Sequence, residues 1–221
     1  MTYDPGMAVV YERSTVPVDG GDLVVGRWGT GDRIVVASHG ITANHLSFTA
    51  IAEHVVQRSE GEVSVVALDH RGRAGSAAVG EPFGLVAHGD DVASVLDHLG
   101  LDRAVLIGHS LGGFIVANTA ERHPERCERL VLIDGGVPFP GGDQMPDPDA
   151  DIEALVLAVI GPALARLDMR FESVDAYVDF FRQHPAFQPP NEWTETIEAY
   201  VRYVRVQPDF PTEKKDPVTC V

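Results

Sequence analysis

Positive charge is scarce in this sequence of 221 residues. Lysine and arginine together number 17 against 33 aspartates and glutamates, which gives a formal net charge of −16. Such a surface repels phosphate backbones and anionic membranes, so we expect no nucleic-acid partner and no membrane partner. Cysteine is rarer still, with Cys127 and Cys220 the two present. They give no disulfide framework and fit a reducing compartment.

Long hydrophobic runs and a secretory signal are also missing. Residues 154–165 are mostly apolar, but 12 residues that include Gly161 and Pro162 are too few to span a membrane. The first residues lack the basic segment and the apolar core of a secretory signal. With 44% hydrophobic residues, the chain can bury one globular core, with or without an insertion. We therefore expect a soluble, cytoplasmic protein.

Strand patterns alternate with helix patterns through the first 140 residues. Apolar and β-branched runs bounded by turn residues predict strands over 23–28, 33–38, 63–68, 103–107 and 130–133. Apolar stripes at helical spacing predict helices over 44–58, 85–99 and 111–123. This alternation predicts an α/β fold with a mostly parallel sheet and helices on both faces. Ligands of such sheets bind beyond the carboxyl ends of the strands.

The pattern changes after residue 140. Residues 141–148 form a glycine- and proline-rich loop, and from 149 to about 206 the pattern predicts helices, one capped by Ser173, and no strand. We expect a core over 1–140, a helical cap or lid over 141–206, and a disordered tail over 207–221. Six aromatic residues of the cap could line an apolar pocket: Phe171, Tyr177, Phe180, Phe181, Phe187 and Trp193.

The most informative stretch is 105–113, where an apolar run meets Gly108-His109-Ser110-Leu111-Gly112 and then a helix-forming segment. This context predicts that Ser110 lies on a sharp strand-to-helix turn with its hydroxyl exposed. Such a turn crowds the neighbouring backbone, and a Cβ at Gly108 or Gly112 would clash there. His109 is the variable residue inside the turn, so we do not expect it to act as a base for Ser110.

Three further features follow strands of the expected sheet. His39-Gly40 follows the apolar run 34–37, the segment 69–76 follows the next strand, and Asp134 ends the strand after the serine helix. In this order, together with the serine turn, they resemble the α/β-hydrolase fold family, in particular its single-domain members with a helical cap. The resemblance covers roughly residues 8 to 206.

The resemblance implies a role for several matching positions. Ser110 would be the nucleophile that attacks a carbonyl and forms a covalent acyl intermediate. The backbone N–H groups of Leu111 and Ile41 would form the oxyanion hole, so the apolar side chains at these positions are no objection. No cofactor is implied. No metal is expected either, because no His/Cys cluster at ligand spacing is present.

The segment 69–76 matches the family's Asp-x-Arg-Gly turn, with Ala74 where a glycine is often found. We expect Arg71 to tie loops together through its guanidinium group. Among the histidines, His39 is expected to stabilise its own loop and His70 to line the cleft. His45, near the start of a helix, is expected to be solvated or to pair with the helix dipole.

The family's chain order is serine, acid, histidine, with the histidine on a loop after the final strand. Asp134 can be the acid, because some family members place it after this strand; alternatively it bonds the adjacent Gly-Gly turn. No histidine follows His184, which lies in the expected cap. By this resemblance, we expect the chain to stop before the family's last two strands and terminal helix. The strand 130–133 becomes an exposed sheet edge, open to self-association.

Three functions are compatible with these residues. The first is a serine hydrolase that acts on a small, fairly apolar ester, thioester or amide through an acyl-enzyme on Ser110. The second is a catalytically inactive or truncated protein of the same fold, a binding module or fragment, which the missing histidine favours. The third is a lyase or cofactor-free oxygenase, because the same fold can host such chemistry. In each case the expected partner is a small molecule.

Overall fold

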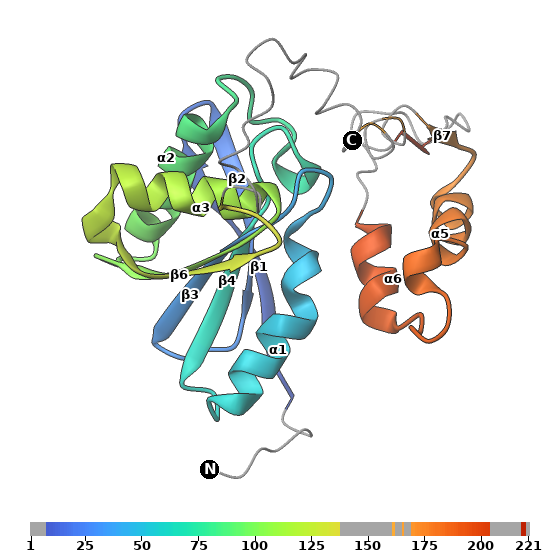
Figure 1. Cartoon of the computed structure of the whole chain (residues 1–221), viewed down its shortest axis with the longest axis horizontal. Helices are drawn as coiled ribbons and strands as arrows, with labels where there is room; N and C mark the ends of the chain where they lie inside the picture. Colours follow the sequence, from blue (N-terminus) through green and yellow to red (C-terminus); the bar gives the residue numbers. More distant parts are fainter. Residues whose placement is uncertain (1–7, 138–160, 162–164, 166–168, 204–217, 220–221) are drawn as a thin grey trace, which may run out of the picture. The chain divides into compact units, whose positions relative to one another are not determined.

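The computed structural model describes residues 8–137, 161, 165, 169–203 and 218–219 (Figure 1). The chain forms two compact units, one over residues 1–137 and the other over 138–221. The first unit carries the predicted α/β core. The second contains the segment in which we predicted a helical cap, and its placement over the strand ends stays a prediction.

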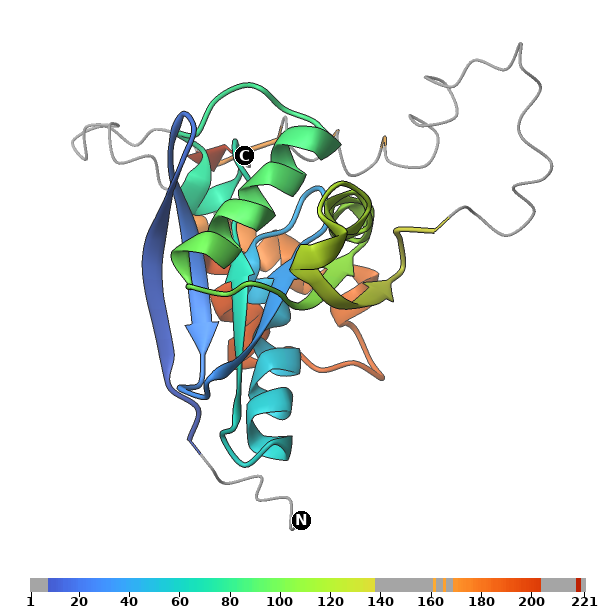
Figure 2. The same ribbon diagram turned by 90° about the vertical axis from the view of Figure 1, so that its left-hand side faces the viewer.

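A six-stranded sheet forms the centre of the first unit. Its strands are β1 (Tyr11–Val18), β2 (Gly21–Trp28), β3 (Arg33–Ser38), β4 (Val63–Leu68), β5 (Ala104–His109) and β6 (Cys127–Ile133), in the spatial order β1-β2-β4-β3-β5-β6. The pairs β1–β2 and β2–β4 are antiparallel, whereas β4–β3, β3–β5 and β5–β6 are parallel. Figure 2 shows the β1–β2 hairpin at one edge of this sheet. The prediction of a mostly parallel sheet is confirmed.

Helices cover both faces of the sheet, as predicted. They are α1 (Thr49–Arg58), α2 (Leu85–His98) and α3 (Leu111–Arg122), with short 3₁₀ turns η1 (His45–Phe48), η2 (Ala74–Ser76) and η3 (Pro124–Arg126). Val66 and Leu68 of β4 belong to the core cluster that includes α2 and α3, whereas Val65 and Ala67 pack with α1. Successive strand residues point to opposite faces, so one strand supplies both cores. Figure 1 shows α1 on one side of the sheet and α2 and α3 on the other.

Strand β1 was not predicted. Its side chains are mostly exposed, with Val16 the one fully buried residue, so the sequence shows no clear two-residue alternation of apolar and polar side chains. The helix predicted over 44–58 also begins differently. Asn44 caps the 3₁₀ turn η1 by accepting a hydrogen bond from the Leu46 N–H, and the α-helix itself starts at Thr49.

The second unit contains α5 (Val174–Arg182), η4 (Pro185–Phe187) and α6 (Glu195–Arg202). Ser173 caps α5, as predicted, because its Oγ accepts from the Ala176 N–H at 3.1 Å. The predicted pocket-lining aromatics pack against one another in a single cluster within this unit. One finding differs both from the prediction of helices without strands and from the prediction of a disordered tail. A two-residue strand β7 (Arg170–Phe171) pairs with β8 (Val218–Thr219), and both are too short to give a recognisable pattern. The rest of the tail, 207–217 and 220–221, lies outside the described residues.

Strand β6 lies at an edge of the sheet, as predicted, with β5 as its neighbour within the described residues. Leu130 and Val131 on this strand are 38% and 42% exposed. None of the described helices combines the length and the apolarity that crossing a bilayer requires.

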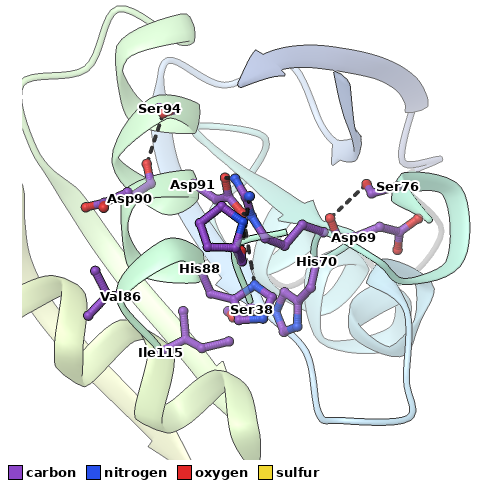
Figure 3. A network of polar contacts seen from close by, with 12 residues as sticks. Ser38, Asp69, His70, Ser76, Val86, His88, Asp90, Asp91, Ser94 and Ile115 are labelled. Carbon is purple, nitrogen blue, oxygen red and sulfur yellow. Dashed lines mark hydrogen bonds and ion pairs between the residues drawn. The ribbon is translucent and has the colours of Figure 1, made fainter. Parts of the chain in front are cut away.

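The Arg71 guanidinium ties three segments of the first unit together, as predicted. Its Nε and Nη2 donate to the two carboxylate oxygens of Asp91 at 2.7 and 2.6 Å. Its remaining hydrogen bonds go to the backbone carbonyls of Asp19, Gly80 and Pro82. Both partners of the ion pair are almost completely buried, and Figure 3 shows Asp91 on α2 among the neighbouring polar side chains.

We expect Arg71→Met to lower the free energy of unfolding by about 3–5 kcal/mol, because it leaves a buried carboxylate without its cation. Urea denaturation measures this change. Arg122→Met is the matched control, because the Arg122–Asp90 pair is 33% and 50% exposed. Loss of that pair should cost less than about 1 kcal/mol. Equal losses in the two variants would contradict this account of the Arg71 site.

Candidate active site

Ser110 lies in the predicted sharp turn between β5 and α3. Its φ of 51° and ψ of −119° place it in the left-handed region that residues other than glycine rarely adopt. Its N–H donates to the Ile133 carbonyl and its carbonyl accepts from the Gly113 N–H, both at 2.9 Å. The side chain is partly exposed. Strain of this kind persists only where the surrounding structure holds it, and it is common at functional sites.

The glycines around Ser110 are required by close backbone approach, as predicted. A Cβ at Gly108 would lie 2.2 Å from the Gly112 carbonyl oxygen, and one at Gly112 would lie 2.0 Å from the Ser38 carbonyl oxygen. A Cβ at Gly135, in the turn after β6, would lie 2.3 Å from the Ser110 carbonyl oxygen. The carboxyl ends of β3, β5 and β6 therefore meet in backbone contact around the serine.

The segment after β3 also reaches Ser110. A Cβ placed on Gly40 would lie 3.4 Å from the Ser110 Cβ and 3.2 Å from His109 Nδ1. Gly40 is buried, and Ile41 follows it directly. Leu111 is the first residue of α3, where backbone N–H groups have no partner within the helix and favour negative charge. The structure thus brings the segments of Ile41 and Leu111 to Ser110, while the oxyanion role of their amides stays a prediction.

His39 stabilises its own loop, as predicted, and its hydrogen bonds define its protonation. A carbonyl can only accept, so Nδ1–H donates to the Gly40 carbonyl at 2.7 Å. Nε2 accepts from the His70 N–H at 3.2 Å, which requires an unprotonated nitrogen. The ring is therefore neutral, and burial lowers its pKa to about 4.

His70 does not line a cleft, contrary to the prediction. Its ring is buried, stacks on His39 with centroids 3.8 Å apart, and bonds Ser38 Oγ through Nε2 at 2.8 Å. The ring centroids of His70 and His88, a residue of α2, are 5.2 Å apart. Figure 3 shows both side chains. Burial lowers the pKa of both rings. Within residues 8–137 none of these histidines is hydrogen-bonded to Ser110.

His45 is fully buried, contrary to the prediction of a solvated position. Its backbone N–H and its Nδ1 lie 2.8 and 2.9 Å from Asp69 Oδ1, and Nε2 lies 2.7 Å from the Tyr11 hydroxyl. Burial alone would raise the pKa of Asp69, but hydrogen bonds and charge from His45 outweigh it, and the pKa is lowered. This cluster cannot be recognised from local sequence patterns, because its members lie 24 and 34 positions apart.

Asp134 lies at the end of β6, with a φ of 50° and an exposed side chain. Within residues 8–137 neither a hydrogen bond to its carboxylate nor an ion pair is found. Asp134 therefore does not bond the adjacent Gly-Gly turn, contrary to that prediction, and its role as the acid stays a prediction. In the described part of the chain, no group of three or more His, Cys, Asp or Glu side chains is arranged to hold a metal ion.

Comparison with known proteins agrees with this geometry. Residues 33–187 match the family model described as alpha/beta hydrolase fold, so the chain belongs to the α/β-hydrolase fold family. Over 72 residues it is 42% identical to a putative carbamate hydrolase, RutD, of Caulobacter sp. (strain K31), which covers 32% of this chain and 27% of that protein. It is 36% identical over 121 residues to a non-heme haloperoxidase of Rhodococcus erythropolis, with 54% and 42% covered.

The chain thus spans less than half the length of each of these two relatives. Among solved structures, the thioesterase domain from the curacin biosynthetic pathway superposes with a TM-score of 0.66 at 17% identity. That match covers 96% of this chain and 72% of the other, and it shows the shared fold.

We expect acid to destabilise the fold through the neutral ring of His39. An unfolded histidine binds a proton near pH 6.5, whereas folded His39 stays neutral down to about pH 4. Between these values the unfolded state binds more protons, so stability falls as the pH drops. The difference between the two pKa values corresponds to a loss of about 3 kcal/mol in the free energy of unfolding. Urea denaturation between pH 7 and 4 measures it, and His39→Gln should weaken the dependence. If the free energy of unfolding of this variant depends on pH as steeply as that of the wild type, the pH dependence does not come from His39.

Proposed function

We propose that this protein is a serine hydrolase in which Ser110 forms an acyl-enzyme with a small, fairly apolar ester, thioester or amide. The observation that carries the proposal is the strained Ser110 turn with Gly40 packed against it. A serine so placed presents its hydroxyl at the carboxyl ends of parallel strands, where α/β sheets bind their ligands.

In the proposed reaction, Ser110 Oγ attacks the substrate carbonyl carbon and the carbonyl oxygen becomes an oxyanion. The N–H groups of Ile41 and Leu111 donate to that oxygen, and the positive end of the α3 dipole favours its charge. Collapse of this intermediate expels the alcohol, thiol or amine and leaves the acyl group on Oγ. Water then attacks the acyl-enzyme, which releases the acid and restores the serine.

The hydroxyl proton of Ser110 must pass to a base during the attack. Within residues 8–137 no histidine is hydrogen-bonded to Ser110, so an active chain takes its base from another residue or from a second chain. Loss of the base costs on the order of a million-fold in kcat in a serine protease. The oxyanion hole and substrate binding alone still retain roughly 10³–10⁴ over the reaction in water.

The names of two relatives bear on the substrate and on the alternatives. Hydrolysis of a carbamate, named for the Caulobacter relative, is also attack on an acyl carbon, which supports the hydrolase. The name non-heme haloperoxidase favours a second candidate, lyase or cofactor-free oxygen chemistry on the same fold. The lack of a histidine bonded to Ser110 in residues 8–137 favours a third, a binding module that keeps the pocket without turnover.

A fluorophosphonate probe tests the proposal. We expect the folded protein to be labelled on the peptide that contains Ser110 and Ser110→Ala to lose the label, because only an activated hydroxyl attacks phosphorus at a useful rate. Ser94→Ala on α2 is the matched control and should label like the wild type. Mass spectrometry of the digested protein identifies the labelled residue.

The other outcomes separate the alternatives. Folded protein that takes no label supports the inactive binding module. Turnover of a non-ester substrate that persists in Ser110→Ala supports the lyase or oxygenase. Either result overturns the acyl-enzyme proposal.

We also propose that the β6 edge pairs with a second copy of the chain. The β6 strands of two copies would pair in antiparallel orientation, related by a two-fold axis at Leu130, the middle residue of the strand. All seven residues of β6 can then pair with those of the other copy. Sedimentation equilibrium should therefore show a dimer that Val131→Lys shifts to monomer. Ile51→Lys on α1, at a residue 40% exposed, is the matched control and should leave the dimer intact. A monomer at all concentrations would contradict this proposal.

A further inference from the structure

The residues between His39 and His45 are held at both ends by the two residues that follow β4. At one end, His39 Nε2 accepts from the His70 N–H. At the other end, the N–H and Nδ1 of His45 both bond Asp69 Oδ1. The segment between them, 40–44, contains the glycine that abuts Ser110 and the proposed oxyanion donor Ile41. Its position therefore depends on these two anchors.

Asp69 is the more constrained anchor, because both of its carboxylate oxygens are occupied. Oδ1 accepts two hydrogen bonds from His45, and Oδ2 accepts one from the Gly75 N–H at 3.0 Å. The side chain has no exposed surface. Movement of the carboxylate would break hydrogen bonds to two different loops at once. In Asp69→Asn, the side-chain N–H₂ group would face either the donors of His45 or the Gly75 N–H. Donor would then face donor, and that hydrogen bonding would be lost.

The ring of His45 is fixed on its other side by the β1–β2 hairpin. Nε2 bonds the Tyr11 hydroxyl at 2.7 Å, and the two rings are nearly parallel, with an interplanar angle of 10°. Gly26 on β2 leaves room for them. A Cβ there would lie 2.5 Å from His45 Cδ2 and 2.9 Å from Tyr11 Cε2. The hairpin is thus shaped to receive this ring, which cannot turn away from Asp69 without losing the Tyr11 contact.

The order of groups, hydroxyl, imidazole and carboxylate, is that of a catalytic triad, but it does not make Tyr11 a nucleophile. Burial raises the pKa of Tyr11, so the phenol keeps its proton. Asp69 is turned toward the backbone of its own loop as well as toward His45. The arrangement holds a loop in place and does not activate a hydroxyl.

We propose that Asp69 and His45 are positioning residues that fix the Ile41 amide beside Ser110. This inference rests on the proposed function, because it assigns the purpose of the contact to the oxyanion hole. A loop displaced by about 1 Å would still bind substrate but would stabilise the oxyanion poorly, and such a displacement can cost about 100-fold in rate.

Amide hydrogen exchange of the peptide that spans 40–44 tests the positioning without requiring activity. We expect Asp69→Asn and His45→Leu to speed exchange there at least about tenfold relative to β5, because the anchor opens locally. His45→Asn retains a side-chain N–H that can reach Asp69, so it should exchange like the wild type. Asp91→Asn changes another buried carboxylate, which binds Arg71, and is the matched control.

Steady-state kinetics gives the second measurement. Asp69→Asn and His45→Leu should lower kcat by about 10- to 100-fold with KM within about twofold. His45→Asn should restore kcat, a rescue that a general loss of stability would not produce. If Asp69→Asn does not fold, the two His45 variants decide the question.

Unchanged exchange over 40–44 in both disrupting variants would overturn the inference, as would equal acceleration in Asp91→Asn. If the serine hydrolase proposal itself fails, the experiments give a different result. In that case the wild type takes no label on Ser110, while hydrogen exchange still reports whether Asp69 and His45 hold the loop.

Discussion

Close contact between backbone segments around Ser110 is the constraint on which the rest of the site depends. The serine keeps a left-handed conformation because its neighbours leave no room for another path: Gly112 touches the Ser38 carbonyl and Gly135 touches that of Ser110. Each contact joins the end of one parallel strand to the next. The sheet thus supplies both the strain and the support that makes it persist, and it holds Ser110 at the carboxyl end of β5.

The first unit also contains buried polar side chains that hydrogen-bond one another and the nearby backbone. His39 and His70 are neutral and bond backbone or serine groups, while Asp69 and Asp91 bond His45 and Arg71 respectively. Buried polar groups are costly unless paired, so these side chains tolerate few arrangements. They therefore fix the loops that meet at Ser110 more firmly than apolar packing alone would, since apolar contacts have no preferred direction.

The sequence predicted those parts of the molecule that depend on local pattern. Strands β3 and β4 have the predicted bounds because both are mostly buried and rich in apolar and β-branched residues. The serine turn was predicted because its glycines and flanking elements lie within nine consecutive residues. Strand β1 was missed because Val16 alone is fully buried in it. His45 and His70 were misjudged, since their burial depends on partners far away in the chain, including Tyr11 and Ser38.

The central claim is that Ser110 faces two amides across the space that a reacting carbonyl would occupy. The most direct measurement is a crystal structure of the protein after reaction with a methyl fluorophosphonate. The account predicts a phosphonyl group on Ser110 Oγ whose free oxygen lies about 2.7–3.1 Å from the amide nitrogens of Ile41 and Leu111. A phosphonyl oxygen that points to solvent, away from both amides, would contradict it.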